Sequence, residues 1–199
     1  MNKQTDNYRR RFLITTTSVV AGSGVVLATI PFVRYMLPSA QARNAGAPVD
    51  VDISKLKPGQ QMTIEWRSKP VWILHRTSRN LSDLKERSHL TNLADPGSSV
   101  LSQQPTYAKN DYRSLRPEYL VTTALCTHLG CVPTYRPEQG PTDLGSEWPG
   151  GYFCPCHGSR FDLAGRVYRN APAPTNLVIP PHYYISDTII KIGEDLQSE

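Results

Sequence analysis

Two short segments hold all four cysteines of this chain and one histidine each, and they constrain the fold more than any other feature. They read CTHLGC at residues 126–131 and CPCHGS at residues 154–159. Each segment offers one thiolate and one imidazole, in the spacings C-x-H and C-x-x-H, with one further cysteine nearby. Thiolates and imidazoles are common ligands of iron–sulfur and zinc centres. The two segments therefore predict a metal centre that joins two loops of the chain.

Six donors are more than one site uses, so several assignments are open. A tetrahedral zinc site takes four of them, but the C-x-C pair of the second segment departs from the usual spacing of zinc ligands. The same short pair argues against a cluster held by four cysteines. Two structural disulfides would suit an exported chain, yet they leave the mirrored histidines without a role. A [2Fe-2S] cluster held by two cysteines and two histidines accounts for both segments.

The two segments resemble those of the Rieske iron–sulfur subunits of cytochrome bc complexes, the quinol–cytochrome c oxidoreductases. In that family the ligands of the single [2Fe-2S] cluster are the first cysteine and the histidine of each segment. On this chain the implied ligands are Cys126, His128, Cys154 and His157. The family's two remaining cysteines form a disulfide between the loops. The implied disulfide here joins Cys131 and Cys156.

The resemblance implies a function in respiratory electron transport. Subunits of this family take one electron from quinol, usually ubiquinol, at a neighbouring cytochrome b subunit and pass it to a c-type cytochrome. They do so within a dimeric multisubunit reductase that contributes to the proton-motive force. His157 is then the residue that accepts the quinol hydroxyl proton, and His128 shares its acid–base behaviour. Because neutral imidazoles replace two anionic thiolates, such a cluster accepts an electron more readily than a four-cysteine cluster.

Residues near the second segment are expected to tune the cluster potential. Ser159 is the candidate hydrogen-bond donor to the cluster, and such donors stabilise its reduced state. Two residues later the family usually has a tyrosine that donates a second hydrogen bond, whereas this chain has Phe161. We therefore expect a lower potential than that of relatives with tyrosine. The segment 171–174 matches the family's proline loop apart from its first residue, and with Leu129 it is expected to form an apolar docking rim.

Two other functions use a similar ligand set. A soluble Rieske ferredoxin or oxygenase component shares the ligand pairs, but it usually lacks the spare cysteines and a membrane anchor. The Rieske small subunit of another periplasmic oxidoreductase, such as arsenite oxidase, can share the export signal and the disulfide. The long insert between the two segments, residues 132–153, favours the quinol complex.

An uncharged N-terminal stretch predicts one membrane-spanning helix. Residues 12–33 carry no charged side chain, and these 22 residues are long enough for a hydrocarbon core of about 30 Å. Four basic residues against one acid in residues 1–11 place the N-terminus in the cytoplasm and the cluster domain in the periplasm. The motif YRRRFL at residues 8–13 resembles a twin-arginine export signal. We expect residues 12–38 to be an uncleaved anchor in the cytoplasmic (inner) membrane, although Ala40-Gln-Ala42 has the form of a cleavage site.

The remaining chain predicts a short hinge and one β-rich domain. Residues 39–48 are small and carry a single charge, which is typical of a flexible linker. Residues 49–199 suffice for one all-β domain, an antiparallel β-sandwich with a smaller cluster-binding subdomain at about residues 126–174. The expected strands are 61–66, 71–75, 119–124, 176–179, 183–186 and 188–192, and the expected helix is 80–87.

Two residue classes carry no function in this interpretation. The three histidines outside the two segments have no ligand spacing, so we expect them to be structural or surface residues. Residues 39–199 hold 17 of the 22 basic and 16 of the 17 acidic side chains. This near balance argues against nucleic acid as a partner.

Overall fold

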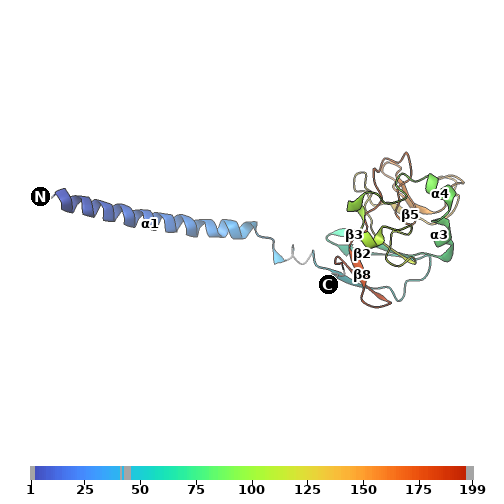
Figure 1. Cartoon of the computed structure of the whole chain (residues 1–199), viewed down its shortest axis with the longest axis horizontal. Helices are drawn as coiled ribbons and strands as arrows, with labels where there is room; N and C mark the ends of the chain where they lie inside the picture. The colour runs from blue at the N-terminus through green and yellow to red at the C-terminus, as the bar shows by residue number, and fades with distance from the viewer. Residues whose placement is uncertain (1–2, 41, 43–45, 196–199) are drawn as a thin grey trace. The chain divides into compact units, whose positions relative to one another are not determined.

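The computed structural model describes residues 3–40, 42 and 46–195. The chain divides into two compact units, residues 1–44 and residues 45–199. Figure 1 shows the single long helix of the first unit and the strands and short helices of the second.

The first unit is built on one long helix, α1 (Lys3–Met36). Its segment Asn7–Met36 has a mean hydropathy of 1.8 and is long and apolar enough to cross a membrane. Side-chain hydroxyls on this helix bond back to its own backbone, since Thr15 donates to the Arg11 carbonyl at 2.9 Å. The expected hinge and the cleavage motif include residues 41 and 43–45, which lie outside the described residues.

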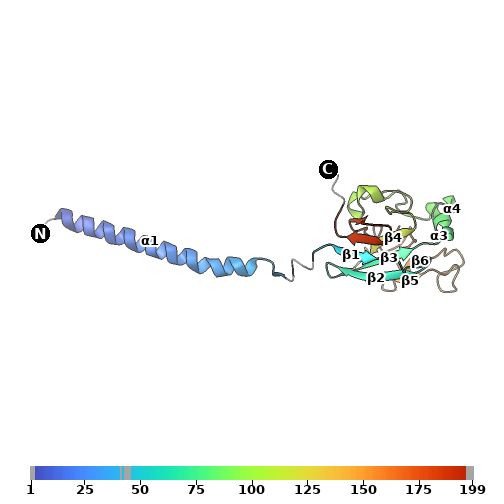
Figure 2. The same ribbon diagram turned by 90° about the horizontal axis from the view of Figure 1, so that it is seen from below.

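The second unit contains three antiparallel sheets of three strands each (Figure 2). The first sheet has the order β1 (Val49–Asp52), β9 (Ile189–Ile192) and β8 (His182–Tyr184). The second has the order β2 (Gln61–Trp66), β3 (Lys69–His75) and β4 (Tyr119–Thr123). The third has the order β5 (Thr134–Arg136), β6 (Gly151–Phe153) and β7 (Arg160–Phe161). The expected antiparallel all-β fold is confirmed.

Strand β3 separates two apolar cores because successive side chains of a strand point to opposite faces of the sheet. Val71 and Ile73 pack into one core, whose other members come mainly from β1, β4 and β9. Trp72 and Leu74 pack into the other core, which also contains buried residues of both Cys/His segments. The middle sheet therefore supports the cluster-binding loops on one face and the β1–β9–β8 sheet on the other.

The prediction of a strand at residues 176–179 is wrong. The backbone groups of this segment bond to three separate partners rather than to one neighbouring strand. The Leu177 N–H donates to Gly165, the Ile179 N–H donates to Gln103, and the Val178 carbonyl accepts from Thr123. The short strands β1, β5, β6 and β7 were not expected, because runs of two to four residues carry too little alternation to be recognised in sequence.

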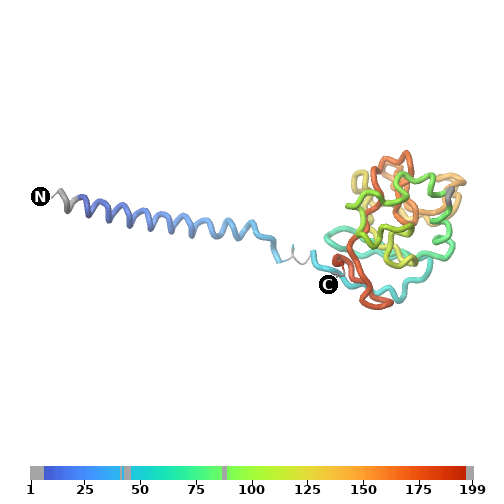
Figure 3. The backbone as a smooth tube through the Cα atoms, viewed as in Figure 1, coloured from blue at the N-terminus to red at the C-terminus, as the bar shows by residue number. Residues whose placement is uncertain are grey.

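The expected helix at 80–87 is replaced by two short helices, α3 (Ser78–Asp83) and α4 (Arg87–Thr91). The N-cap of α3 is Thr77, whose side chain accepts from the Asn80 N–H while the Asn80 side chain accepts from the Thr77 N–H. This reciprocal capping starts the helix earlier than expected. Two 3-10 turns follow, η1 (Leu101–Gln103) and η2 (Thr106–Ala108). Figure 3 traces this path through the second unit.

Candidate metal centre

Two loops with the same backbone hydrogen bonds carry the cysteines and histidines. Residues 126–131 connect β4 to β5, and residues 154–159 connect β6 to β7. In each loop the N–H of the first cysteine donates to the carbonyl of the sixth residue at 2.8 Å, and its carbonyl accepts from the fifth residue at 2.9 Å. The fifth residues are Gly130 and Gly158, whose φ angles of 82° and 79° lie in the left-handed region. A side chain would strain this conformation, so both loops depend on glycine here.

One disulfide links the two loops. It joins Cys131 at the end of the first loop to Cys156 in the second, the pair that the family resemblance implies. Cys126 and Cys154 are free thiols and are only 3% and 1% exposed. The sulfur atoms of Cys131, Cys154 and Cys156 lie within 4.8 Å of one another. Because two of these sulfurs form the disulfide, they cannot serve as thiolate ligands, and their proximity places the Cys154 thiol beside the disulfide.

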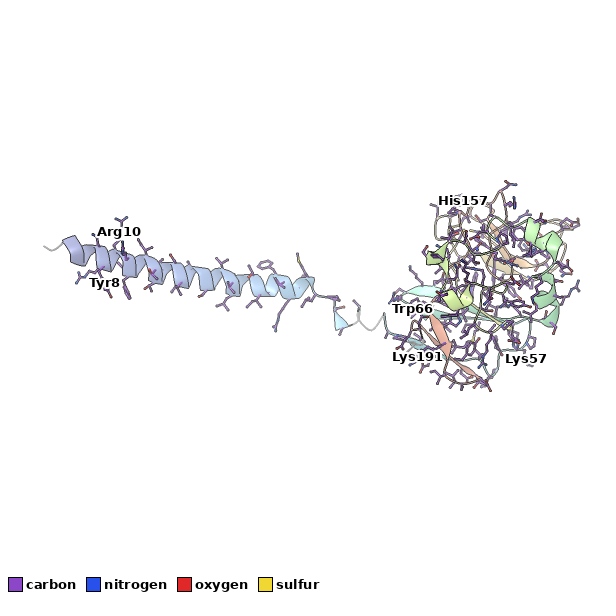
Figure 4. All side chains as sticks on the ribbon, in the orientation of Figure 1. Tyr8, Arg10, Lys57, Trp66, His157 and Lys191 are labelled. Carbon is purple, nitrogen blue, oxygen red and sulfur yellow. A yellow bond between two sulfur atoms is a disulfide. The ribbon has the colours of Figure 1, made fainter. Side chains whose placement is uncertain are left out.

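The two histidines of the loops lie against each other. Their ring centroids are 4.7 Å apart, with ring planes at 89°. His157 is exposed, and Figure 4 shows it at the edge of the second unit. His128 is partly buried, and its Nδ1 atom is buried without a hydrogen-bond partner among the described residues. A buried nitrogen without a partner is costly unless a ligand occupies it.

The donor set fits a cluster held by two thiolates and two imidazoles. Burial raises the pKa of the Cys154 thiol, and the adjacent Cys126 thiol also acts to raise it. A buried pair of this kind is held as thiolates by a metal cation. The unsatisfied Nδ1 of His128 is a ready ligand atom on the same loop as Cys126. We therefore propose Cys126, Cys154, His128 and His157 as the cluster ligands.

Comparison with known proteins assigns the family. The family described as "Rieske [2Fe-2S] domain" matches residues 49–181, and the family described as "Ubiquitinol-cytochrome C reductase Fe-S subunit TAT signal" matches residues 1–39. The ubiquinol-cytochrome c reductase iron-sulfur subunit of Allochromatium vinosum is 60% identical over 187 residues, which cover 94% of this chain and 89% of that protein. The chain belongs to the Rieske iron–sulfur subunits of ubiquinol–cytochrome c reductase.

A second relative carries the same description, and one solved structure is also similar. The Rieske subunit of this reductase from Blastochloris viridis is 42% identical over 185 residues, covering 93% of this chain and 92% of that protein. A chain in the solved structure of a hyperthermophilic respiratory complex III is 23% identical, with a TM-score of 0.47, and the match covers 90% of this chain and 98% of that chain. The cofactor of a Rieske domain is one [2Fe-2S] cluster, as expected from the two segments.

Hydrogen bonds connect the Rieske proline loop, residues 171–174, and the adjacent Thr175 to the two cluster loops. The Ala173 N–H donates to Ser159 Oγ at 3.0 Å. Thr127 Oγ1 in the first loop donates to the Thr175 carbonyl at 2.6 Å. Because the oxygen of the buried Ser159 already accepts from Ala173, its own proton remains available for an acceptor such as a cluster sulfur. Ser159 was identified from sequence, whereas Thr127 was not, because only the fold brings it to Thr175.

The apolar residues around the Rieske loops divide into exposed and buried groups. Leu129 is 71% exposed although it lies between the two loop residues His128 and Gly130. Pro172 and Pro174 are also exposed. Phe161 is fully buried in the core that also holds the two free thiols. Because the Phe161 ring carries no hydroxyl, it cannot donate the hydrogen bond that a tyrosine would donate. The lower cluster potential expected from the sequence remains a prediction.

A buried ionic group follows the second Rieske loop. Asp162 is 1% exposed and accepts from Arg166 Nε at 2.7 Å and from His89 Nε2 at 3.0 Å. Although burial alone raises the pKa of Asp162, the Arg166 guanidinium and His89 hold that pKa well below its usual range. His89 therefore has a structural role, as expected. No sequence pattern marked Asp162: its partner Arg166 is only four residues away, but His89 comes from α4, and the burial of the group depends on the fold.

Two further arginines are buried and have no carboxylate partner among the described residues. The guanidiniums of Arg76 and Arg113 each donate to several backbone carbonyls. Arg76 donates to the Leu163 carbonyl, and Arg113 donates to the Leu177 carbonyl. Burial lowers the pKa of each to about 10, so both remain charged at neutral pH. These side chains tie the long irregular segment 101–116 to the elements that follow the second loop.

Proposed function

We propose that this chain takes one electron from quinol at a neighbouring cytochrome b subunit and passes it to a c-type cytochrome subunit. The observation that carries this proposal is His157, an exposed imidazole on a loop whose Cys154 thiol is buried. Such a residue contacts the cluster on one side and a substrate on the other. The 60% identity to an iron-sulfur subunit of ubiquinol-cytochrome c reductase favours this function over a small subunit of an arsenite-oxidase type enzyme.

The residues around the cluster have separate roles in the reaction. When bound, the [2Fe-2S] cluster supplies a one-electron acceptor, with a potential raised by its two neutral ligands. His157 accepts the hydrogen bond and then the proton of the quinol hydroxyl through the imidazole nitrogen that would not bind the cluster. His128 is less exposed and shares this acid–base behaviour. Ser159 donates a hydrogen bond that favours the reduced state.

The rim around His157 suits docking on membrane subunits. Leu129, Pro172 and Pro174 are exposed apolar side chains on the two loops that flank the site. Burying such side chains favours association by about 25 cal/mol per Å² of apolar surface. We propose that this rim docks at the quinol site of cytochrome b in a dimeric complex. The N-terminal helix then anchors the chain in the cytoplasmic membrane, with the cluster domain in the periplasm.

The testing experiment is a redox titration of the electron paramagnetic resonance signal of the reduced cluster in native membranes. It is run at several pH values, with and without an inhibitor of the quinol-oxidation site. A Rieske-type signal whose potential falls as pH rises, and which shifts with the inhibitor, is the expected result. A Rieske signal indifferent to the inhibitor would instead favour another periplasmic oxidoreductase. Absence of the signal would refute the cluster assignment.

A further inference from the structure

A cavity of about 570 Å³ opens beside the second cluster loop. Gly158 of that loop and Ala171 of the proline loop line one side of it. Two buried apolar residues, Leu144 and Trp148, line it as well. The cavity therefore adjoins the same loops as His157 without including any proposed ligand.

Two arginines give the cavity a positive charge. Arg160 and Arg169 line it and are exposed. Arg160 has no side-chain hydrogen bond or ion pair within the described part of the chain. Arg169 Nε donates to the Leu93 carbonyl at 3.0 Å, and its two terminal nitrogens have no partner among residues 46–195. Glu147 is the acid on the cavity wall, and it pairs with neither arginine among the described residues.

An aromatic pair adds apolar surface beside these cations. Tyr168 also lines the cavity, and its ring stacks on Trp148 at a centroid distance of 6.0 Å. The Tyr168 hydroxyl is itself buried from solvent, so it is not a donor into the open cavity. The cavity thus offers guanidinium donors beside apolar side chains, which suits a carboxylate carried on an apolar stem.

We propose that the cavity receives an acidic side chain from the c-type cytochrome that accepts the electron. This inference rests on the proposed function and extends it to partner recognition. The apolar rim of Leu129, Pro172 and Pro174 suits the membrane-embedded site of lipid-soluble quinol. A charged cavity suits a partner in water, because surface charges steer association between soluble surfaces. Occupation of the cavity would hold the acceptor next to His157.

The test uses the complete complex in native membranes, with the c-type haem oxidised rapidly and electron transfer from the reduced cluster followed in time. R160E/R169E is expected to slow this transfer about tenfold at low ionic strength, and the difference from the native protein should shrink as salt is added. E147Q is expected to speed the transfer, because it removes the negative charge of the cavity wall. K57E is the control for a single charge reversal at a remote site, since Lys57 is exposed and lies well away from His157 in Figure 4.

The outcomes separate this proposal from the proposed function. An unchanged Rieske resonance signal in R160E/R169E, with transfer as fast as in K57E at every ionic strength, would overturn the cavity proposal and leave the function standing. If R160E/R169E loses the signal through misfolding, R160Q/R169Q replaces it with the same expectation and a smaller effect. Inorganic phosphate should compete with the acidic side chain for the cavity, so at constant ionic strength it is expected to slow transfer in the native protein but not in R160Q/R169Q; equal slowing of both proteins would overturn the cavity proposal. Slower quinol oxidation in R160E/R169E, with unchanged electron transfer to the cytochrome, would also overturn the cavity proposal.

Discussion

Removing the disulfide with C131A/C156A should lower the free energy of unfolding of the cluster-bearing unit by about 3.5 kcal/mol. The two cysteines are separated by 25 residues in sequence. In the chain-entropy model, closing a loop of this length removes roughly 12 cal/mol/K from the unfolded ensemble, or about 3.5 kcal/mol at 25 °C. The side chains themselves add little, because Cys156 is exposed and Cys131 is only partly buried.

The assay is urea unfolding of the purified full chain in detergent, followed by circular dichroism of the backbone and of the cluster. C131A and C156A each remove the same bond, so each single variant should lose nearly as much stability as the double variant. Reduction of the native protein with a thiol reagent should produce the same loss. The double variant is the control for that treatment, because it has no disulfide to reduce.

Three results would refute the reasoning. A loss below about 1 kcal/mol in the double variant would mean that the loop is already constrained in the unfolded state. Additive losses in the two single variants would show that side-chain contacts, rather than the bond, carry the stability. A reductant that destabilises the double variant as much as the native protein would show that its effect does not pass through this disulfide.

Three further changes test other parts of the structure. F161Y should raise the cluster potential in a redox titration, because the new hydroxyl is expected to donate to a ligand sulfur; an unchanged potential would show that another donor compensates. D162N should lower the free energy of unfolding by about 3–5 kcal/mol at neutral pH, because it leaves Arg166 buried without its partner. Because the folded state holds the pKa of Asp162 below its usual range, the native protein should lose stability as pH falls below about 4, and D162N should lack this dependence. T77A should cost about 1 kcal/mol in thermal unfolding by removing the side-chain cap of α3, and N80A should add a further cost, because the Asn80 side chain accepts separately from the backbone N–H of residue 77.

Much of the fold was predictable from local pattern. Strand β2 has the expected bounds, and β3, β4, β8 and β9 differ from the expected ranges by one or two residues. Alternation and turn residues identify the longer strands β2, β3 and β4, whereas aromatic residues in β8 and β-branched residues in β9 identify the two shorter ones. The short strands β5 to β7 and the irregular segment 176–179 were not predictable. Their backbone groups find partners that are distant in sequence, and no local periodicity records such partners.

For the site, the sequence by itself determined the chemistry: which side chains are able to bind iron, the family to which they belong, and an uncharged stretch long enough to cross a membrane. These properties follow from residue type and from spacing along a few residues. The family resemblance already implied the disulfide between Cys131 and Cys156, which the structure contains. Only the tertiary structure decided that His157 is exposed while His128 is partly buried, and that Thr127 reaches Thr175. It also decided that Arg160 and Arg169 share a cavity beside the cluster loops. These contacts and the burial of each side chain depend on how loops from different sheets pack against one another.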